Sequence, residues 1–462
     1  MDYVEFIAKK HIRQRSVGFV ADESKIPEKL FDWQREIVKW ATDKGRAAIF
    51  ASCGMGKTAM QLSWAKQVAI HTNMPLLILA PLAVNEQTAN EGMFFGIEAE
   101  SIRSMDEVKN NGIYIMNYEM ISHITPDIFG GIVLDESSIL KALTGKTKTA
   151  LTDMFSLTPY RLCCTATPAP NDHAELGNHA EFLGVMRTPE MLSTWFVNDG
   201  FESGKWRLKG HAKEDFWEWV SSWAVCVNKP SDIGDYDDSQ YKLPELVTIR
   251  HDIKIDETDF ENGALIRMKK SSASTIKKDM RKTMDARIKE AASIVKSLDG
   301  KPCIIWCELN DESSGLIDAI PGAVEITGSM KPDEKSKRMV QFTNGEISTL
   351  ITKPKIAGFG MNWQHCNNMI FVGCSYSFEA RYQSIRRCWR FGQKNTVYDH
   401  VILAGQESKI FDVIAEKERK YIEMEKSMSG SFTKNARQTK VAKAAYNGKN
   451  NIIIPDFLKQ EA

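Results

Sequence analysis

A glycine-rich segment that ends in lysine and threonine offers the first chemistry in this chain. Residues 51–58 read Ala-Ser-Cys-Gly-Met-Gly-Lys-Thr, which is the phosphate-loop pattern except that alanine replaces its first glycine. Gly54 and Gly56 allow backbone N–H groups to turn toward phosphate oxygens, and the N-terminus of a following helix adds its dipole. Lys57 would then reach the β- and γ-phosphates, and Thr58 would ligate Mg²⁺. The segment predicts a nucleotide-binding site.

Two adjacent carboxylates could complete that site. Asp135 and Glu136 end the apolar run 131–134. At one strand end, Asp135 would hold the Mg²⁺ and Glu136 would polarise the attacking water as general base. An acidic loop without a function is the simpler alternative, but the strand and its position after Lys57 favour catalysis. Upstream, Gln34 carries a side-chain amide that can donate to and accept from an adenine edge, so the predicted nucleotide is ATP.

Two arginines lie three residues apart much later in the chain. Arg387 and Arg390 fall on one face of a short predicted helix and could reach the γ-phosphate of a nucleotide. A planar, permanently charged guanidinium suits that task. Gly358 and Gly360 follow the apolar run 349–352 and would let the backbone approach ATP, although plain turn chemistry is an alternative. Arginines from a distant segment indicate hydrolysis coupled to the closing of a cleft.

Alternating apolar runs and helical stretches must position these residues. The first series of runs comprises 48–51, 76–80, 113–116, 132–134 and 161–164, and the second comprises 303–306, 324–326, 349–352, 369–372 and 397–403. Near-continuous apolar strands separated by helices are typical of parallel sheets that are covered on both faces. Ligands gather at the carboxyl ends of such strands. The predicted fold class is therefore α/β, with two domains that each contain a parallel sheet.

Composition agrees with a large globular protein. The chain has 462 residues, of which 43% are hydrophobic and 26% charged, and its 60 basic residues balance 60 acidic ones. The chain lacks the overall excess of basic residues that is typical of proteins that bind nucleic acid by electrostatics alone. Any binding of nucleic acid therefore needs a local basic groove. No apolar run approaches the roughly 18 residues that span a bilayer, and no secretory signal is evident, so we expect a cytoplasmic protein without membrane contact. Nine scattered cysteines favour buried, reduced thiols over disulfides or zinc.

The two series of runs suggest domain boundaries. We expect an N-terminal domain over residues 1–245, with a Trp-rich extension at 173–245, and a C-terminal domain over 246–425. A linker is expected near 240–256. Residues 426–462 form a basic tail that could contact a partner or nucleic acid, or simply be a frayed terminus. Five tryptophans lie in the extension, at positions 195, 206, 217, 219 and 223. Their spacing favours core packing over stacking on bases.

Taken in order, these segments resemble superfamily 2 helicases of the Swi/Snf-like branch, and among those the compact versions found in bacteriophages and prophages. The resemblance covers roughly residues 30–420. The matching segments are Gln34, 51–58, 80–82, 117–119, 135–138 followed by Lys141, 165–168 with Asn171, 358–363 and 383–393. One departure is Ser138, where the family usually has histidine, which suggests altered coupling. No chromatin-reading appendage is apparent, and this weakens nucleosome remodelling as a function.

The resemblance implies further roles. It implies two tandem RecA-like domains with an ATP cleft between them. Its last motif places the γ-phosphate arginines at Arg387 and Arg390 and leaves Arg386 as an extra charge. It assigns coupling to Thr165, Thr167 and Gln383. It assigns contacts with the nucleic-acid backbone to segments near Pro81, Tyr118, Lys141, Thr352 and Lys353.

The predicted function is that of an ATP-dependent DNA helicase or translocase that uses Mg²⁺ and moves along duplex or forked DNA without sequence preference. An RNA helicase is the main alternative. A small-molecule phosphotransferase would not need a second sheet with paired arginines. A non-catalytic scaffold that binds nucleic acid or a nuclease would not need Glu136. A separate nuclease or recombination partner remains a hypothesis, and a monomer is favoured.

Overall fold

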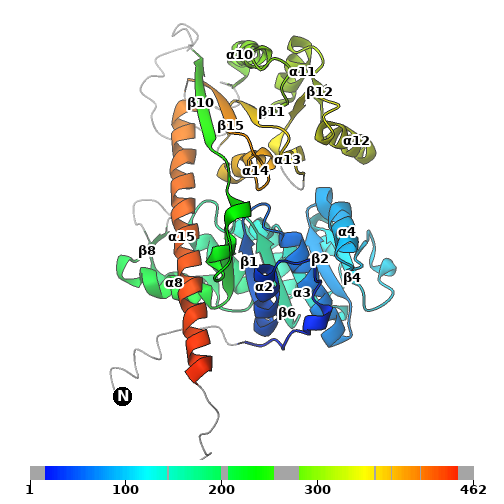
Figure 1. Ribbon diagram of the computed structural model, residues 1–462, viewed down its shortest axis with the longest axis vertical. Coiled ribbons are helices and arrows are strands. Elements are labelled where there is room, and N and C mark those ends of the chain that lie inside the picture. Colours follow the sequence, from blue (N-terminus) through cyan, green and yellow to red (C-terminus); the bar gives the residue numbers. More distant parts are fainter. Residues whose placement is uncertain are drawn as a thin grey trace, which may run out of the picture.

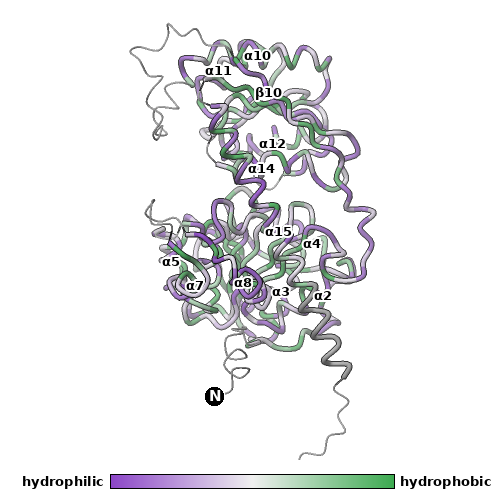
Figure 2. The backbone as a smooth tube through the Cα atoms, turned by 90° about the vertical axis from the view of Figure 1, so that its left-hand side faces the viewer, coloured by the Kyte–Doolittle hydropathy of each residue, from purple (hydrophilic) through white to green (hydrophobic). Residues whose placement is uncertain are grey.

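The computed structural model describes residues 16–142, 145–198, 206–253, 280–357, 361–375, 377–405 and 407–445, with side chains up to residue 432. Two α/β bodies lie one above the other in both views (Figures 1 and 2). Each is built on one large sheet, as the sequence predicts. The fold class is confirmed as two tandem RecA-like domains.

The first sheet has seven strands, in the order β3-β4-β2-β5-β6-β1-β9, and every neighbouring pair is parallel. The strands are β1 (Arg46–Ala51), β2 (Leu76–Ala80), β3 (Glu100–Ser101), β4 (Ile113–Asn117), β5 (Gly131–Asp135), β6 (Tyr160–Thr165) and β9 (Ala224–Val227). All five runs predicted for this sheet are strands. Because the strands are parallel, their carboxyl ends, with the phosphate loop and Asp135, meet at one edge.

Helices cover both faces of this sheet. They are α2 (Asp32–Lys44), α3 (Lys57–Thr72), α4 (Asn85–Phe94), α5 (Lys146–Met154), α6 (Leu176–Phe182), α7 (Thr188–Trp195) and α8 (Lys213–Ser221). Alternate side chains of one strand enter different cores. Ile78 packs with residues of α2 and α3, whereas Leu77 and Leu79 pack with residues of α5 to α8. Burial on both faces is why the strands read as unbroken apolar runs.

The second sheet has six strands, in the order β10-β15-β14-β11-β13-β12, again all parallel. They are β10 (Leu246–Ile253), β11 (Cys303–Cys307), β12 (Val324–Glu325), β13 (Thr349–Thr352), β14 (Asn368–Val372) and β15 (Val397–Ala404). The accompanying helices are α10 (Met284–Ser297), α11 (Asn310–Ala319), α12 (Pro332–Thr343), α13 (Pro354–Ala357) and α14 (Phe378–Cys388). The last helix, α15 (Glu407–Ala445), follows β15 and continues past the expected start of the tail at 426.

Two segments differ from expectation. Residues 246–253, expected within a linker, form β10, which pairs with β15 along its full length. The strand escaped notice because it carries Arg250, His251 and Asp252 in an alternating pattern of half-buried and exposed positions. The Trp-rich extension also supplies β9, which adds an edge strand beside β1. A short hairpin of β7 (Phe196–Asn198) and β8 (Trp206–Leu208) lies in the same region.

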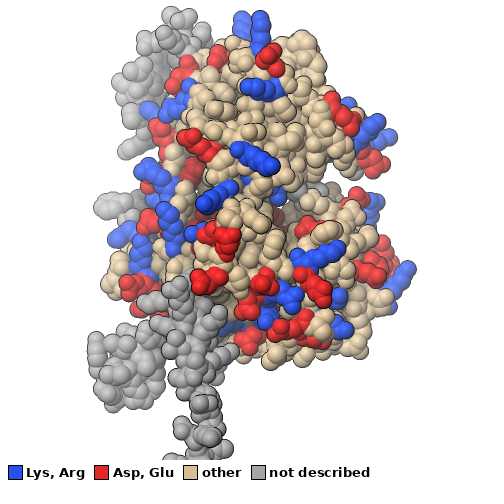
Figure 3. Space-filling view, viewed as in Figure 1, with Lys and Arg blue, Asp and Glu red and all other residues tan. Residues whose placement is uncertain are grey.

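The tryptophans of the extension belong to the core, as expected. Trp217, Trp219 and Trp223 are almost fully buried, and Trp219 stacks on Trp195 with ring centroids 4.7 Å apart. All nine cysteines are buried and free. Within the described residues, no helix is both long enough and apolar enough to cross a bilayer. Basic and acidic side chains mix over the face seen in Figure 3, in keeping with the balanced charge of the sequence.

Candidate ATP site at the interface of the two domains

The phosphate loop connects β1 to α3. Gly56 precedes α3 with φ 75° and Gly54 has φ 89°, in the left-handed region that favours glycine. No side chain caps the N-terminus of α3. The first backbone N–H groups of this 16-residue helix therefore remain available to an anion, and the helix dipole favours one. This geometry fits a bound phosphate.

Lys57, Glu136 and Thr165 converge beside the loop. The Lys57 ammonium lies 3.4 Å from Glu136 Oε1, and the Thr165 hydroxyl donates to Glu136 Oε2 at 3.3 Å. Glu136 adopts a left-handed backbone with φ 51°, which costs energy for a residue with a Cβ and is frequent at functional sites. The proposed general base is thus held by the phosphate-loop lysine on one side and by a residue of the proposed coupling segment on the other.

Asp135 lies next to this cluster at the end of β5. Burial, together with the neighbouring Glu136, raises the pKa of Asp135 to about 7, although Lys57 opposes the shift. Burial tends to lower the pKa of Lys57, but Glu136 and Asp135 outweigh it and raise that pKa. A carboxylate so poorly solvated favours the arrival of a cation. The electrostatics fit the Mg²⁺ that the sequence implies.

The donor set also fits a metal that arrives with a nucleotide. In the parts of the chain that the structure describes, no group of three or more His, Cys, Asp or Glu side chains could hold a metal alone. Thr58 and Asp135 would supply two oxygen ligands, and phosphate oxygens and water would supply the others, as Mg²⁺ prefers. When bound, the ion would neutralise charge on the phosphates.

Gln34 lies beside the loop, and its amide already makes two hydrogen bonds. Its Oε1 accepts from the Phe31 N–H at 3.0 Å, and its Nε2 donates to the Met55 carbonyl at 3.0 Å. The side chain therefore ties the start of α2 to the phosphate loop. One N–H and one lone pair of this amide have no partner in these two bonds, so contact with an adenine edge stays a prediction.

Helix α14 brings the second domain against the loop. The Cys53 thiol is 3.9 Å from Gln383 Oε1, and Arg386 Nη2 donates to the Cys53 carbonyl at 2.9 Å. Arg387 and Arg390 are held differently, since both donate to the carbonyl of Met361 in their own domain, at 3.1 and 3.3 Å.

Arg387 and Arg390 nevertheless lie near the candidate site. Burial lowers the pKa of Arg387, with Cys53 and Glu136 opposing the shift. Burial and the neighbouring Arg387 lower the pKa of Arg390 to about 10, with Cys53 opposing. The two arginines that the motif assigns to the γ-phosphate thus bond a carbonyl of their own domain. Arg386, which the motif left as an extra charge, directly contacts the loop.

Another interdomain contact involves Lys141. This lysine forms an ion pair with Glu379 at the start of α14, and the other carboxylate oxygen of Glu379 accepts from the Thr167 hydroxyl at 3.3 Å. The ammonium that the resemblance assigns to a nucleic-acid phosphate is thus occupied by a carboxylate of the second domain. Thr167, from the proposed coupling segment, shares the same partner.

The remaining predicted nucleic-acid residues differ in accessibility. Pro81 is partly exposed, whereas Tyr118 is buried and donates to the Asp135 carbonyl at 2.7 Å. Thr352 is buried and donates to the Ile326 carbonyl at 3.1 Å, whereas Lys353 is partly exposed and donates to Asn310 Oδ1 at 2.6 Å. Gly358 and Gly360 lie outside the described residues.

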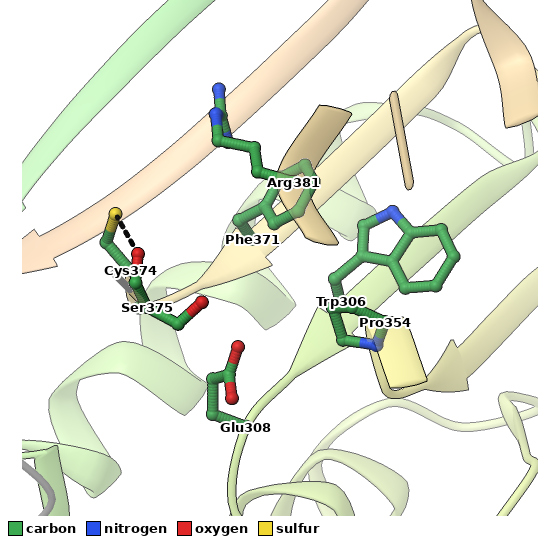
Figure 4. Close-up of a pocket in the computed structure, with 8 residues that line it drawn as sticks. Trp306, Glu308, Pro354, Phe371, Cys374, Ser375 and Arg381 are labelled. Atoms are coloured by element: carbon green, nitrogen blue, oxygen red, sulfur yellow. Dashed lines mark hydrogen bonds between the residues drawn. The ribbon is translucent and has the colours of Figure 1, made fainter. Parts of the chain in front are cut away.

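A small pocket lies at the carboxyl edge of the second sheet. Figure 4 shows Trp306, Glu308, Phe371 and Arg381 around it. Arg381 forms an ion pair with Asp399 and lies over the Phe371 ring, with its guanidinium 4.6 Å from the ring centroid. Burial raises the pKa of Glu308. The pocket is lined by the second domain alone and contains none of the proposed ATP residues.

Several interface residues escaped the sequence reasoning. Arg386 and Glu379 touch the first domain, and so does Tyr421 of α15. The helical spacing of Glu379, Gln383 and Arg386 was a usable signal, because residues four and then three apart share one face of a helix. Tyr421 belongs to an apolar row with Met424, Met428 and Phe432 at helical spacing, which was a second usable signal.

Comparisons with known proteins find one matching family model and similar proteins. Residues 286–392 match the helicase conserved C-terminal domain. Putative protein p41 of Acyrthosiphon pisum secondary endosymbiont phage 1 is 24% identical over 430 residues, covering 80% of this chain and 92% of the phage protein. The solved Sulfolobus solfataricus SWI2/SNF2 ATPase core in complex with dsDNA has a TM-score of 0.43 and 16% identity, covering 91% of this chain and 97% of that one.

The second domain is therefore a helicase conserved C-terminal domain, placed beside a RecA-like domain that contains a phosphate loop. The match confirms the resemblance to superfamily 2 helicases, and the phage relative agrees with the compact phage versions named above. The match over residues 286–392 supports a nucleic-acid-dependent ATPase of the helicase type.

Proposed function

We propose that this protein hydrolyses ATP to move along DNA, as a Swi/Snf-like translocase that unwinds DNA or displaces bound proteins. One observation carries the proposal: α14 of the helicase domain packs its Gln383 and Arg386 against the phosphate loop, next to Lys57 and Glu136. ATP bound there would contact both domains, so binding and hydrolysis would change how the domains sit together.

Within this proposal each residue has a defined task. Lys57 neutralises charge on the β- and γ-phosphates, and Glu136 orients and deprotonates the attacking water. Arg387 and Arg390 leave the Met361 carbonyl and stabilise charge on the γ-phosphoryl oxygens. Thr165 donates to Glu136 and accepts from the Thr167 N–H, so it couples the presence of ATP at the site to the position of Thr167.

The choice of DNA over RNA rests on the sequence of the last motif. Gln383 and the pair Gly392-Gln393 follow the Swi/Snf-like pattern, whose members act on duplexes. Contacts through Lys141 and Lys353 would reach phosphates rather than bases, so binding should be independent of sequence and sensitive to salt.

ATPase activity measured with a panel of ligands tests the proposal. Duplex, single-stranded and forked DNA would be compared with duplex and single-stranded RNA of the same sequence, with Lys57→Ala as the inactive control. We expect stimulation by duplex or forked DNA. Stimulation by RNA alone would establish the alternative RNA helicase, and absence of hydrolysis with every ligand would leave a non-catalytic scaffold.

A further inference from the structure

Helix α15 connects the two domains physically. It starts at Glu407, directly after β15 of the second sheet, and runs down beside the first domain to α8 (Figure 1). One of its faces is buried there through a row of side chains spaced three or four residues apart, namely Tyr421, Met424, Met428 and Phe432. The Phe432 ring meets Trp40 of α2 edge-on, with ring centroids 5.5 Å apart.

Polar contacts fix the same docking. Lys417 donates to Asn171 Oδ1 at 2.9 Å, and Glu423 pairs with Lys213 of α8 at 2.8 Å. The Tyr421 hydroxyl bonds the carbonyl of Ala166, which lies between the two threonines of the proposed coupling segment. The helix therefore belongs to the second domain by chain order and to the first by its packing.

Tyr421 also contacts the second domain's α14. Its ring packs on Tyr382, with ring centroids 5.5 Å apart, and its hydroxyl lies 2.9 Å from Oε1 of the half-buried Glu425. Burial raises the pKa of the Glu425 carboxyl, whereas Tyr421 and Arg386 oppose the shift. The Arg386 guanidinium in turn lies over the Tyr382 ring, 5.9 Å from its centroid.

Arg386 is the group on which these contacts converge. Its side chain is 3% exposed, and its guanidinium lies over the rings of Trp389 and Phe391, 5.2 and 5.6 Å from their centroids. Its bond to the Cys53 carbonyl has a structural consequence, because a planar peptide fixes the N–H of Gly54 antiparallel to that carbonyl. The direction of one loop donor is thereby set from the other domain.

We propose that Arg386 is a positioning residue for the phosphate loop, and that α15 supports Arg386 through Tyr421, whose ring packs on the Tyr382 ring beneath that guanidinium. This role differs from that of a γ-phosphate arginine, since Arg386 acts on the loop backbone and thereby on nucleotide affinity. The site needs the C-terminal helix even though every proposed phosphate ligand lies elsewhere. The inference rests on the proposed ATP-binding function of the loop.

Nucleotide affinity and turnover, measured separately in the full-length protein, test the proposal. Affinity would be measured by calorimetry with ADP and with a slowly hydrolysed ATP analogue, and kcat and KM by DNA-stimulated ATPase. We expect Arg386→Met to weaken nucleotide binding about tenfold, since a hydrogen bond from a charged group is lost. The larger effect should fall on Kd and KM, and Arg386→Lys should recover part of the affinity.

Tyr421→Ala should weaken binding in the same direction, by about threefold, and should have no further effect in the Arg386→Met background, because Tyr421 acts through that arginine. The matched control is Arg419→Met on the exposed face of α15, which should leave affinity unchanged. Thermal unfolding of each variant identifies any that fail to fold. If Arg386→Met is one of them, the nucleotide affinity of the conservative variant Arg386→Lys decides whether Arg386 acts on the loop.

Three results would overturn the inference. Loss of kcat by about a thousandfold at unchanged affinity would make Arg386 a γ-phosphate arginine. Unchanged affinity in both Arg386 variants would remove its role at the loop, and an undiminished Tyr421→Ala effect in the Arg386→Met protein would remove the link to α15. Absence of nucleotide binding by the wild type would instead refute the proposed function itself.

Discussion

The ion pair between Lys141 and Glu379 predicts that the free protein restrains its own DNA binding. Lys141 must release Glu379 before it can reach a DNA phosphate. Glu379→Gln would remove the charge while keeping an oxygen that can accept from Thr167. We therefore expect tighter DNA binding and a higher rate of ATP hydrolysis without DNA, because the contact that joins the domains is weakened.

The size of the effect follows from exposure. The Lys141 side chain is 42% exposed and that of Glu379 is 10% exposed, so the pair is neither a free surface pair nor fully buried. Exposed pairs contribute up to about 1 kcal/mol and hydrogen bonds to charged groups about 1.5–3 kcal/mol. Because solvent screens the half-exposed lysine, we expect this ion pair to contribute about 1 kcal/mol, the value for exposed pairs. That corresponds to about a fivefold decrease in the Kd for DNA.

Fluorescence anisotropy with a labelled duplex over a series of salt concentrations measures this change. Lys141→Met should weaken binding and lower the salt slope by about one. In that background Glu379→Gln should have no effect, since its partner is gone. Glu423→Gln, which breaks the exposed pair with Lys213, controls for the general loss of a negative charge. Unchanged or weaker DNA binding by Glu379→Gln, or an effect that persists without Lys141, would refute the reasoning.

Three further predictions concern the same interface. Arg387→Ala should lower kcat by roughly a thousandfold while nucleotide affinity changes little, in contrast to Arg386→Met, and single-turnover hydrolysis measures this. Thr165→Val, which removes the hydroxyl that holds Glu136, should reduce the stimulation of ATPase by DNA more than it reduces ATP binding; equal losses in both would argue against a coupling role. Finally, burial raises the pKa of Glu425 from 4.5 to about 7. Because the folded state then binds more protons than the unfolded state between these values, stability should fall as pH rises from about 4.5 to 7, by at most roughly 3 kcal/mol. Melting temperatures should show this fall in the wild type and a flatter profile in Glu425→Gln, and a wild type that gains stability over that range relative to the variant would contradict it.

Much of the fold followed from local patterns. The strands of both sheets were found because parallel strands buried on two faces must be apolar throughout, as in β2 and β14. The edge strands β3 and β10 were missed because short or half-exposed strands do not produce such a run. The edge strand β9 was missed for another reason, since its four buried apolar residues lie inside the Trp-rich extension. Local chemistry also located Lys57, Asp135 and Glu136, since a phosphate loop and a strand-end acid pair are defined by adjacent residues.

The tertiary structure decided how the two halves meet. The sequence by itself determined a nucleotide site, a second sheet and an arginine-rich helix between Gln383 and Gln393. Only the packing of α14 and α15 on the first domain showed that Arg386 contacts the loop and that Glu379 occupies Lys141. The physical reason is that these contacts join residues far apart in the chain. Their geometry depends on the relative placement of two domains, which no local periodicity or motif spacing encodes.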